Sequence, residues 1–433
     1  MKADAVRRSL APAAAACAIL AAAATPAGAQ VDFRTYVALG DSLTAGFSSG
    51  SLVVTHQESS YPALLARQVR LASFQQPTVS EPGIPPELAL VSLVPAPIIA
   101  PKATAAGVPT NLLLPSPYNN LGIPGALSVD LLTRTTDDGG FHDLVLRKQG
   151  KTALQQGLAL GPSVVTLWIG NNDVLGAAIR GKAVDGVTLT PASVFRAAYT
   201  AIVDALLAAQ LRTIAANLPD VTSIPFVTTI PPYVVDPASG RPVVVAGQRV
   251  PLLGPNGPLA ESSLVTLAAS ALLARGEGIP AALGGRGTPL PDEVILDAGE
   301  LAMIRERVAA NNQAIAEICR GAGIPVLDVN ALLKEIATTG RVVGGVRLTG
   351  AFLTGGVFSY DGVHPTDLGY ALIANEWIKL INAAGGDIPE INLAPFLGLG
   401  SRGAAPGPGA LPFEFTREAW EALLATFPTV DGR

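Results

Sequence analysis

The chain has 433 residues, of which 49% are hydrophobic, and its formal net charge at pH 7 is -5. A chain of this length and composition can bury a large core. Its acidic balance argues against nucleic acid as a partner.

The first 29 residues have the pattern of a cleaved secretory signal. Basic residues precede an alanine-rich apolar run from Leu10 to Ala24, which ends at the small-residue sequence Ala27-Gly28-Ala29. The run is shorter than the roughly 20 apolar residues of a membrane-spanning helix. We expect cleavage after Ala29 and export to the periplasm or the outside of the cell. Removing this leader, with its three basic residues and one acidic residue, changes the net charge from -5 to -7.

Export also bears on the cysteines, of which the chain has two. Cys17 lies in the leader, so the mature chain keeps only Cys319 and cannot form an intramolecular disulfide. We therefore expect its stability to come from a hydrophobic core.

Strands and helices alternate along the chain, which predicts a parallel α/β sheet covered on both faces. β-branched runs bounded by turn residues predict four strands and a weaker fifth one just before Gly122: Tyr36 to Leu39, Val164 to Ile169, Thr213 to Asn217 and Pro325 to Val329. Helices are predicted from Pro62, over about Pro191 to Ala209, and from Asp297, where Glu300 completes a capping box.

Two segments rich in proline and glycine interrupt this alternation, and we interpret both as insertions. The prolines of residues 71–117 exclude long regular elements. Residues 230–296 predict a hairpin, Val234 to Val245, and then a helix with one apolar face that includes Leu264, Leu267, Ala271 and Leu272. This helix has two interpretations, either ordinary core packing or a lid over an apolar substrate.

The C-terminal tail, residues 388–433, is predicted to be separate from the α/β domain of residues 30–387. Its Gly/Pro-rich part is followed by a short amphipathic helix from Arg417 to Phe427. This helix either docks back on the core or binds a partner.

Histidine is scarce, which narrows the search for a catalytic base to His56, His142 and His364. Only His364 has an aspartate three residues before it, Asp361. In a tight loop this carboxylate can reach Nδ1 of the imidazole and leave Nε2 free to accept a serine proton. A single aspartate three residues before a histidine is common by chance, so this pair alone does not identify a catalytic site.

Two further polar sites follow predicted strands. Asn172, in Trp168-Ile169-Gly170-Asn171-Asn172-Asp173, lies where a side-chain amide can donate to a developing oxyanion. The glycine turn Asn120-Leu121-Gly122-Ile123-Pro124-Gly125 can offer a backbone N–H at the same edge. Each of these segments alone is consistent with an ordinary turn.

Together these segments resemble the SGNH hydrolase superfamily, also called GDSL esterases and lipases. Four of its sequence blocks occur in order: Gly40-Asp41-Ser42-Leu43, the glycine turn, Gly170-x-Asn172-Asp173 and Asp361-x-x-His364. The resemblance implies a three-layer α/β/α sandwich with a parallel, flavodoxin-like sheet. It also implies that Ser42, Asp361 and His364 form the catalytic triad, and that Ser42, Gly125 and Asn172 form the oxyanion hole. Gly122 is the alternative to Gly125.

A second serine competes with Ser42. Gly46-Phe47-Ser48-Ser49-Gly50 fits the G-x-S-x-G elbow of α/β-hydrolases. That elbow directly follows a central strand, whereas Asp41 to Ala45 separates Gly46 from the nearest predicted strand. Ser42 has the strand immediately before it, so we interpret Ser48 as a loop serine near the mouth of the site.

The leading functional hypothesis is hydrolysis of carboxylic esters through an acyl-enzyme, with no cofactor and no metal site. Acyl transfer from the same site is a second hypothesis, and a catalytically silent binding protein with the same fold is a third. The apolar insertions favour lipid or medium-chain esters, with possible contact of the insertions with a lipid surface. The oligomeric state is left open.

Overall fold

A five-stranded parallel sheet lies at the centre of the molecule. The computed structural model describes residues 31–93, 96–400, 413–427 and 429–430. The strand order is β13-β6-β5-β1-β4, and all four pairings are parallel. The strands are β1 (Tyr36–Gly40), β4 (Asn120–Gly122), β5 (Val164–Trp168), β6 (Arg212–Ala216) and β13 (Val326–Leu327). The predicted α/β fold and the predicted strand positions are confirmed.

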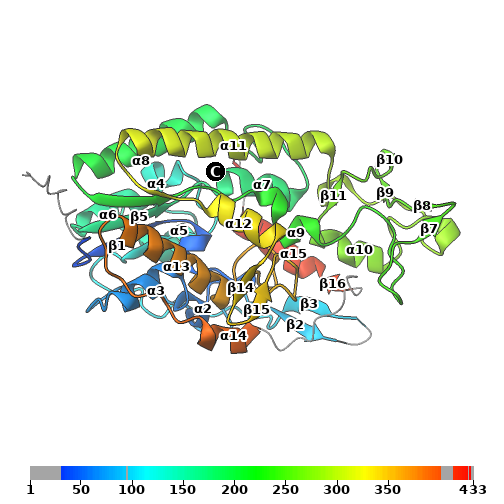
Figure 1. Ribbon diagram of the computed structural model, residues 1–433, viewed down its shortest axis with the longest axis horizontal. Coiled ribbons are helices and arrows are strands. Elements are labelled where there is room, and N and C mark those ends of the chain that lie inside the picture. The colour runs from blue at the N-terminus through cyan, green and yellow to red at the C-terminus, as the bar shows by residue number, and fades with distance from the viewer. Residues whose placement is uncertain (1–30, 94–95, 401–412, 428, 431–433) are drawn as a thin grey trace, which may run out of the picture.

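Helices cover both faces of this sheet (Figure 1). Successive side chains of a strand point to opposite faces. Tyr36 and Ala38 belong to one core cluster, whereas Val37 and Leu39 belong to another. The first cluster packs against α3 (Tyr61–Gln68) and α13 (Asp367–Ala383), and the second against α6 (Ala153–Ala159), α8 (Ala192–Ala208) and α11 (Ala298–Gly321).

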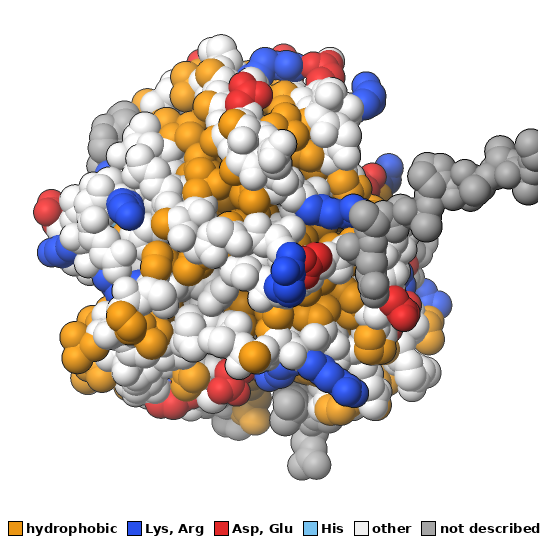
Figure 2. Space-filling model, turned by 90° about the vertical axis from the view of Figure 1, so that its left-hand side faces the viewer, with side chains coloured by type: hydrophobic (Ala, Val, Ile, Leu, Met, Phe, Trp, Pro, Cys, Tyr) orange, Lys and Arg blue, Asp and Glu red, His pale blue; other side chains and the backbone are white. Residues whose placement is uncertain are grey.

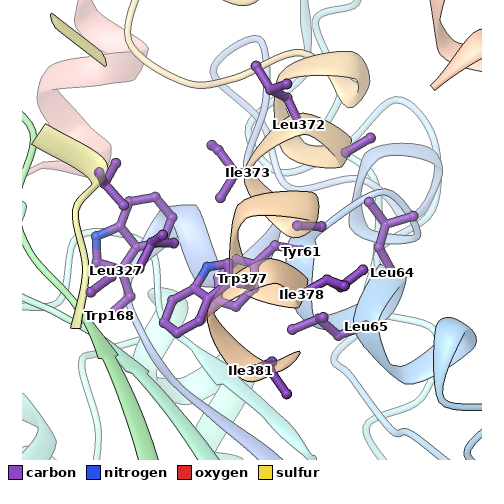
Figure 3. Packing of buried hydrophobic residues seen from close by; sticks show 14 of the residues in the cluster. Tyr61, Leu64, Leu65, Trp168, Leu327, Leu372, Ile373, Trp377, Ile378 and Ile381 are labelled. Carbon is purple, nitrogen blue, oxygen red and sulfur yellow. The ribbon is translucent and has the colours of Figure 1, made fainter. Parts of the chain in front are cut away.

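Aromatic side chains join the helices of the first face to the sheet. The rings of Tyr61 and Trp377 stack with centroids 5.1 Å apart and planes 10° apart. Trp168, at the end of β5, lies 5.8 Å from Tyr61. Figure 3 shows these rings with leucine and isoleucine side chains from α3 and α13 around them. This core holds the end of β5 and the start of α13 in fixed positions.

Helix caps form where the sequence places them. Asp297 and Glu300 make the predicted capping box at the start of α11. Thr366, two residues after His364, caps α13 by accepting a hydrogen bond from the N–H of Gly369.

The remaining elements near the core are α1 (Ser42–Ala45), α2 (Val54–Gln57), α4 (Asp130–Thr133), α5 (Phe141–Leu146), α7 (Asn172–Arg180), α9 (Pro225–Thr228), α12 (Val329–Thr338), β14 (Arg341–Val343), β15 (Val346–Leu348) and α14 (Ala394–Gly400).

In its described residues, the first insertion contains only short regular elements, as its prolines predict. Its β2 (Leu88–Ser92) and β3 (Ile98–Pro101) pair antiparallel. A third strand, β16 (Glu414–Phe415), comes from the C-terminal tail and pairs parallel with β3. The tail therefore completes a small sheet with a segment more than 300 residues away in the sequence.

The second insertion differs from the expectation. The continuous helix expected over Leu264 to Leu272 is wrong, because Leu264–Val265 is strand β11, paired with β12 (Ile295–Leu296). A short 3₁₀ helix, Leu267–Ala269, and α10 (Ser270–Ala274) follow. The apolar spacing fits a helix, but the strand partner at residues 295–296 overrides it. The chain reverses between Asp236 and Arg241, as the hairpin prediction requires. The paired strands are shorter: β7 (Val244–Val245) with β8 (Gln248–Arg249), and β9 (Leu253–Gly254) with β10 (Gly257–Pro258).

The tail helix, α15 (Arg417–Thr426), docks on the core rather than standing free. It packs against α7 and β3, and the side chains of Ala419 and Leu423 are fully buried. Of the two alternatives that the sequence left open, docking is the one the structure shows.

One sequence-based expectation concerns a part of the chain that the structure does not describe. The signal sequence of residues 1–29 lies outside the described residues. Among the residues that are described, no helix is long and apolar enough to cross a membrane.

On the face shown in Figure 2, Lys and Arg side chains are scattered among uncharged ones rather than gathered in one basic patch.

Candidate active site

Ser42 lies two residues after Gly40, the last residue of the interior strand β1, and so follows the carboxyl end of that strand. Asp41 caps the short helix α1, and its carboxylate accepts a hydrogen bond from the N–H of Leu43 at 3.1 Å. β1 pairs with β5 on one side and with β4 on the other. Ligand sites in parallel sheets form at this edge, so Ser42 lies where a substrate crevice is expected.

Three side chains from two distant segments form a continuous hydrogen-bonded chain. His364 Nε2 lies 3.0 Å from Ser42 Oγ, and His364 Nδ1 lies 2.8 Å from Asp361 Oδ2. The exposed fractions are 2% for Ser42, 1% for His364 and 0% for Asp361. Such an arrangement allows the imidazole to take the serine proton while the carboxylate fixes its orientation.

The surroundings of Asp361 keep this carboxyl group ionised. Its Oδ1 accepts hydrogen bonds from the N–H groups of Val363 and His364, both at 2.8 Å. Its Oδ2 accepts the N–H of Gly50 at 2.7 Å. Burial alone would raise the pKa, but the neighbouring His364 and these hydrogen bonds outweigh it and hold the pKa below its usual value.

The loop that follows Ser42 supports this chain rather than supplying a second nucleophile. The Ser48 hydroxyl donates to the carbonyl oxygen of Pro365 at 3.0 Å, and the N–H of Ser49 donates to Ser359 Oγ at 2.8 Å. Gly50 has a left-handed backbone, with φ at 69°, which lets its N–H point at Asp361. Ser48 is 1% exposed, so it is a buried supporting residue and not a serine at the mouth.

The predicted oxyanion donors lie near one another. Asn172 is the first residue of α7, and its Nδ2 donates to the carbonyl oxygen of Ala126 at 2.9 Å. One amide hydrogen remains for a ligand. Ala126 follows Gly125, which has φ at 81°. The N–H of Gly122, the alternative backbone donor, donates to Asn120 Oδ1 at 3.0 Å within the same turn.

The sequence interpretation missed two polar contacts that join these segments. Asn171 Nδ2 donates to Asp41 Oδ2 at 2.8 Å, which links the serine turn to the start of α7. Ser128 donates to Asp173 through both its N–H and its hydroxyl, each at 2.9 Å. Burial raises the pKa of Asp41 and that of Asp173 to about 6. The sequence signal for the first contact was the pair of adjacent asparagines, Asn171 and Asn172, that follows β5. The sequence pattern gave a role only to Asn172.

The other two histidines are bound elsewhere. His142 Nδ1 lies 3.0 Å from Asp137. His56 lies between two carboxylates, with Nδ1 2.8 Å from Asp367 and Nε2 2.8 Å from Glu87. Burial favours the neutral form of His56, but the two carboxylates outweigh burial and raise its pKa to about 10. This cluster is therefore an ion pair network at neutral pH.

Replacing His56 with glutamine is expected to lower the free energy of unfolding by roughly 2 kcal/mol at pH 6, the scale of hydrogen bonds to a charged group. Because the folded-state pKa of His56 lies near 10 and the unfolded value near 6.5, this contribution is complete below pH 6.5 and is lost as the pH rises towards 10. Urea unfolding of both proteins at pH 6 and pH 10 checks this, and an equal difference at the two pH values would contradict it.

Among the described residues, no group of three or more His, Cys, Asp or Glu side chains has the arrangement of a metal site. The site is built from a serine, an imidazole, carboxylates and amides, which together suffice for acyl transfer chemistry.

Comparison with solved structures finds similar chains at low sequence identity, including the following two. One is described as a lipolytic protein of the G-D-S-L family from Desulfitobacterium hafniense, at 14% identity and a TM-score of 0.34, over 80% of this chain and 99% of the other. The second is an acetyl xylan esterase, at 14% identity and a TM-score of 0.33, over 79% of this chain and 98% of the other. Similarity at this level assigns no substrate to the chain. No curated protein is a significant match.

A family model covers most of the chain. The model of GDSL-like lipases and acylhydrolases matches residues 36–377. This span contains β1 with Ser42, the turn at Gly125, the start of α7 and the segment of Asp361 and His364. The chain therefore belongs to the GDSL-like lipase/acylhydrolase family of the SGNH hydrolase superfamily.

Proposed function

We propose that this protein is an exported serine esterase that hydrolyses carboxylic esters through an acyl-enzyme on Ser42. The observation that supports the reaction is the buried chain from Ser42 Oγ to His364 Nε2, at 3.0 Å, and from His364 Nδ1 to Asp361, at 2.8 Å. The signal-like pattern of residues 1–29 supports export.

In the first half-reaction, Ser42 Oγ attacks the acyl carbonyl carbon while His364 Nε2 takes the serine proton. The tetrahedral intermediate collapses, the C–O bond to the alcohol breaks, and His364 gives its proton to the leaving alkoxide. Water then repeats the sequence on the acyl-enzyme and releases the acid. Asp361 remains ionised throughout and stabilises the imidazolium that forms twice in each cycle.

The negative charge on the carbonyl oxygen is stabilised by the N–H groups of Ser42 and Gly125 and by the Asn172 amide. Asn172 is held in place by its hydrogen bond to Ala126, and the start of α7 is joined to the serine turn through Asn171 and Asp41. A donor that is fixed before the reaction costs no reorganisation when the charge develops.

A fluorophosphonate probe tests the reaction directly. It forms a covalent bond with a serine only when the base and the oxyanion donors activate that serine. We expect stoichiometric labelling of Ser42, together with hydrolysis of p-nitrophenyl acetate. Folded protein that is neither labelled nor active would favour a binding protein with this fold over an esterase.

Replacing Asn172 with alanine is expected to lower kcat by on the order of 10² to 10³, the usual effect of losing one oxyanion donor. KM should change little, because the donor acts mainly on the charge of the transition state. Steady-state kinetics with p-nitrophenyl butyrate measure both constants. A fall that appears only in KM would assign Asn172 to ground-state binding instead.

A further inference from the structure

The C-terminal tail reaches the imidazole of His364. The ring of Phe427 stacks on the His364 ring, with centroids 5.5 Å apart and planes 20° apart. A second ring, that of Phe47, lies 4.9 Å from His364 and 6.2 Å from Phe427. Both phenylalanines are fully buried. The tail is therefore part of the wall that encloses the imidazole of the proposed base.

The two phenylalanines are held in different ways. Phe47 belongs to the loop that supports Asp361, and its carbonyl oxygen accepts the hydroxyl of Tyr370 at 2.6 Å. Displacing this loop would also break the hydrogen bond from Gly50 to Asp361. Phe427 follows the last helix of the chain, and its removal leaves every hydrogen bond of Asp361 intact. Ser42 is 2% exposed, so an ester reaches it only if part of this wall moves, and a displaced tail would leave the hydrogen bonds of Asp361 in place.

Contacts along its whole length hold the tail in place, beginning with the pairing of β16 with β3 and the two hydrogen bonds between Phe415 and Ser270 Oγ. Arg180 Nη2, at the end of α7, donates to the carbonyl oxygens of Phe427 at 2.8 Å and Leu424 at 3.3 Å. Trp420 Nε1 donates to the carbonyl oxygen of Ile179 at 3.4 Å. Beyond Phe427, the N–H of Val430 donates to the carbonyl oxygen of Val187 at 2.7 Å. Figure 1 shows α15 running from β16 and the first insertion towards α7.

The tail helix is amphipathic, and its apolar side faces inward. Ala419 and Leu423 are fully buried with Phe427 in one cluster, against which Trp420 and Leu424 also pack. The outer face carries the exposed pair Arg417 and Glu421, joined at 2.7 Å. Lifting this helix into water would expose its apolar side and the surface beneath it, which is unfavourable. A lipid surface removes that penalty, because it can receive both apolar faces.

The small sheet that holds the tail already presents apolar side chains to solvent. On β2, which pairs with β3 beside β16, Val91 is 52% exposed. Leu93, directly after β2, is 67% exposed. In the same insertion, Val108 and Leu113 are 61% and 97% exposed. Single exposed apolar residues are common, but Val91 lies on, and Leu93 directly after, a strand of the sheet that also holds the tail, and apolar side chains next to an amphipathic helix can contact lipid.

We propose that residues 413–427 form a cap over Ser42 and His364, which opens when the protein meets the surface of an aggregated, water-insoluble ester. The proposal rests on the esterase function proposed above and assigns its substrate class, namely lipid esters presented in droplets or micelles. Phe427 is the residue of the cap that covers the imidazole, and Arg180 is the residue of the core that holds the cap closed.

The rate of hydrolysis of tributyrin, measured from below to above its solubility limit, tests the opening at a surface. We expect a low rate in the soluble range and a rise of at least about tenfold when droplets form. Hydrolysis of soluble p-nitrophenyl acetate serves as the reference. If neither ester is hydrolysed, the esterase proposal fails. If the acetate is hydrolysed and the tributyrin rate shows no rise at the solubility limit, the cap proposal fails.

Weakening the closed state gives a second test in soluble substrate alone. Arg180→Gln removes the guanidinium that holds the carbonyl oxygens of Phe427 and Leu424, and it should raise kcat/KM for p-nitrophenyl butyrate by about tenfold, the scale of one hydrogen bond to a charged group. The matched control is Arg417→Gln, on the exposed face of the same tail helix, which should leave the rate unchanged. Equal rates for the two variants would overturn the assignment of Arg180.

Locking the closed state should have the opposite effect. Val187 and Val430 are hydrogen-bonded neighbours, so the double variant Val187→Cys with Val430→Cys can be oxidised to tether the tail beyond Phe427. We expect the oxidised protein to lose most of its activity on both esters and to regain it on reduction, while each single variant stays active. Full activity with the disulfide formed, as verified by mass spectrometry, would overturn the proposal, and the Arg180 variant decides the question if the disulfide does not form.

Discussion

Replacing Ser42 with alanine is expected to lower kcat/KM for p-nitrophenyl butyrate by on the order of 10⁴ to 10⁶, while the protein stays folded. The variant keeps His364 and the oxyanion donors but has no atom that can form the acyl-enzyme, and losses of this size follow removal of a serine nucleophile from a triad. Circular dichroism and the thermal midpoint should match those of the parent protein, because the Ser42 side chain makes only the hydrogen bond to His364 among those described.

The sharpest control for this variant is Ser48→Ala, because the two serines lie six residues apart and fit rival motifs. The Ser48 hydroxyl donates to the carbonyl oxygen of Pro365, next to His364 in the sequence. Its loss should cost about 1 kcal/mol of stability and less than about tenfold in rate. Near-native activity of Ser42→Ala combined with an inactive Ser48→Ala would reverse the assignment of the nucleophile.

Local spacing explains why much of the site was predictable from the sequence. Asp361 and His364 are three residues apart in one tight loop, so their contact follows from the chain itself. Ser42 and Asn172 each follow a buried strand, and parallel strands bring their carboxyl ends to one edge. The contact of Asp361 with His364 thus depends on a single segment, whereas the grouping of Ser42, Gly125 and Asn172 with them came from the resemblance to a known family.

Contacts between distant segments were not predictable in this way. The amphipathic pattern of α15 predicts a buried face but not the surface that covers it, and nothing local connects Phe427 with His364. Similarly, the helical spacing of Leu264 and Leu267 was overridden by the pairing of β11 with residues 295–296. In both cases the deciding partner lies far away in the sequence, where periodicity carries no information.

Replacing Asp361 with asparagine is expected to lower kcat by on the order of 10⁴ with little change in KM. The carboxylate accepts the proton on His364 Nδ1, whereas an amide group at that position donates. The imidazole would then carry its proton on Nε2, which faces Ser42 Oγ, and could not take the serine proton. Kinetics with p-nitrophenyl butyrate measure the loss, and Ser359→Ala, which removes one hydrogen bond to Asp361 but keeps the carboxylate, is the matched control.

The same variant should also reveal how the carboxylate contributes to folding. The pKa of Asp361 lies below its usual value in the folded protein. Its stabilising effect is therefore complete above the unfolded pKa of about 3.9 and is lost as the pH falls through the lower folded-state value. Asp361→Asn should be less stable than the parent at pH 7, by about 1 to 3 kcal/mol, because the N–H of Gly50 loses its acceptor. The difference should shrink below pH 4, and a constant difference would mean that packing rather than charge holds this loop against the base.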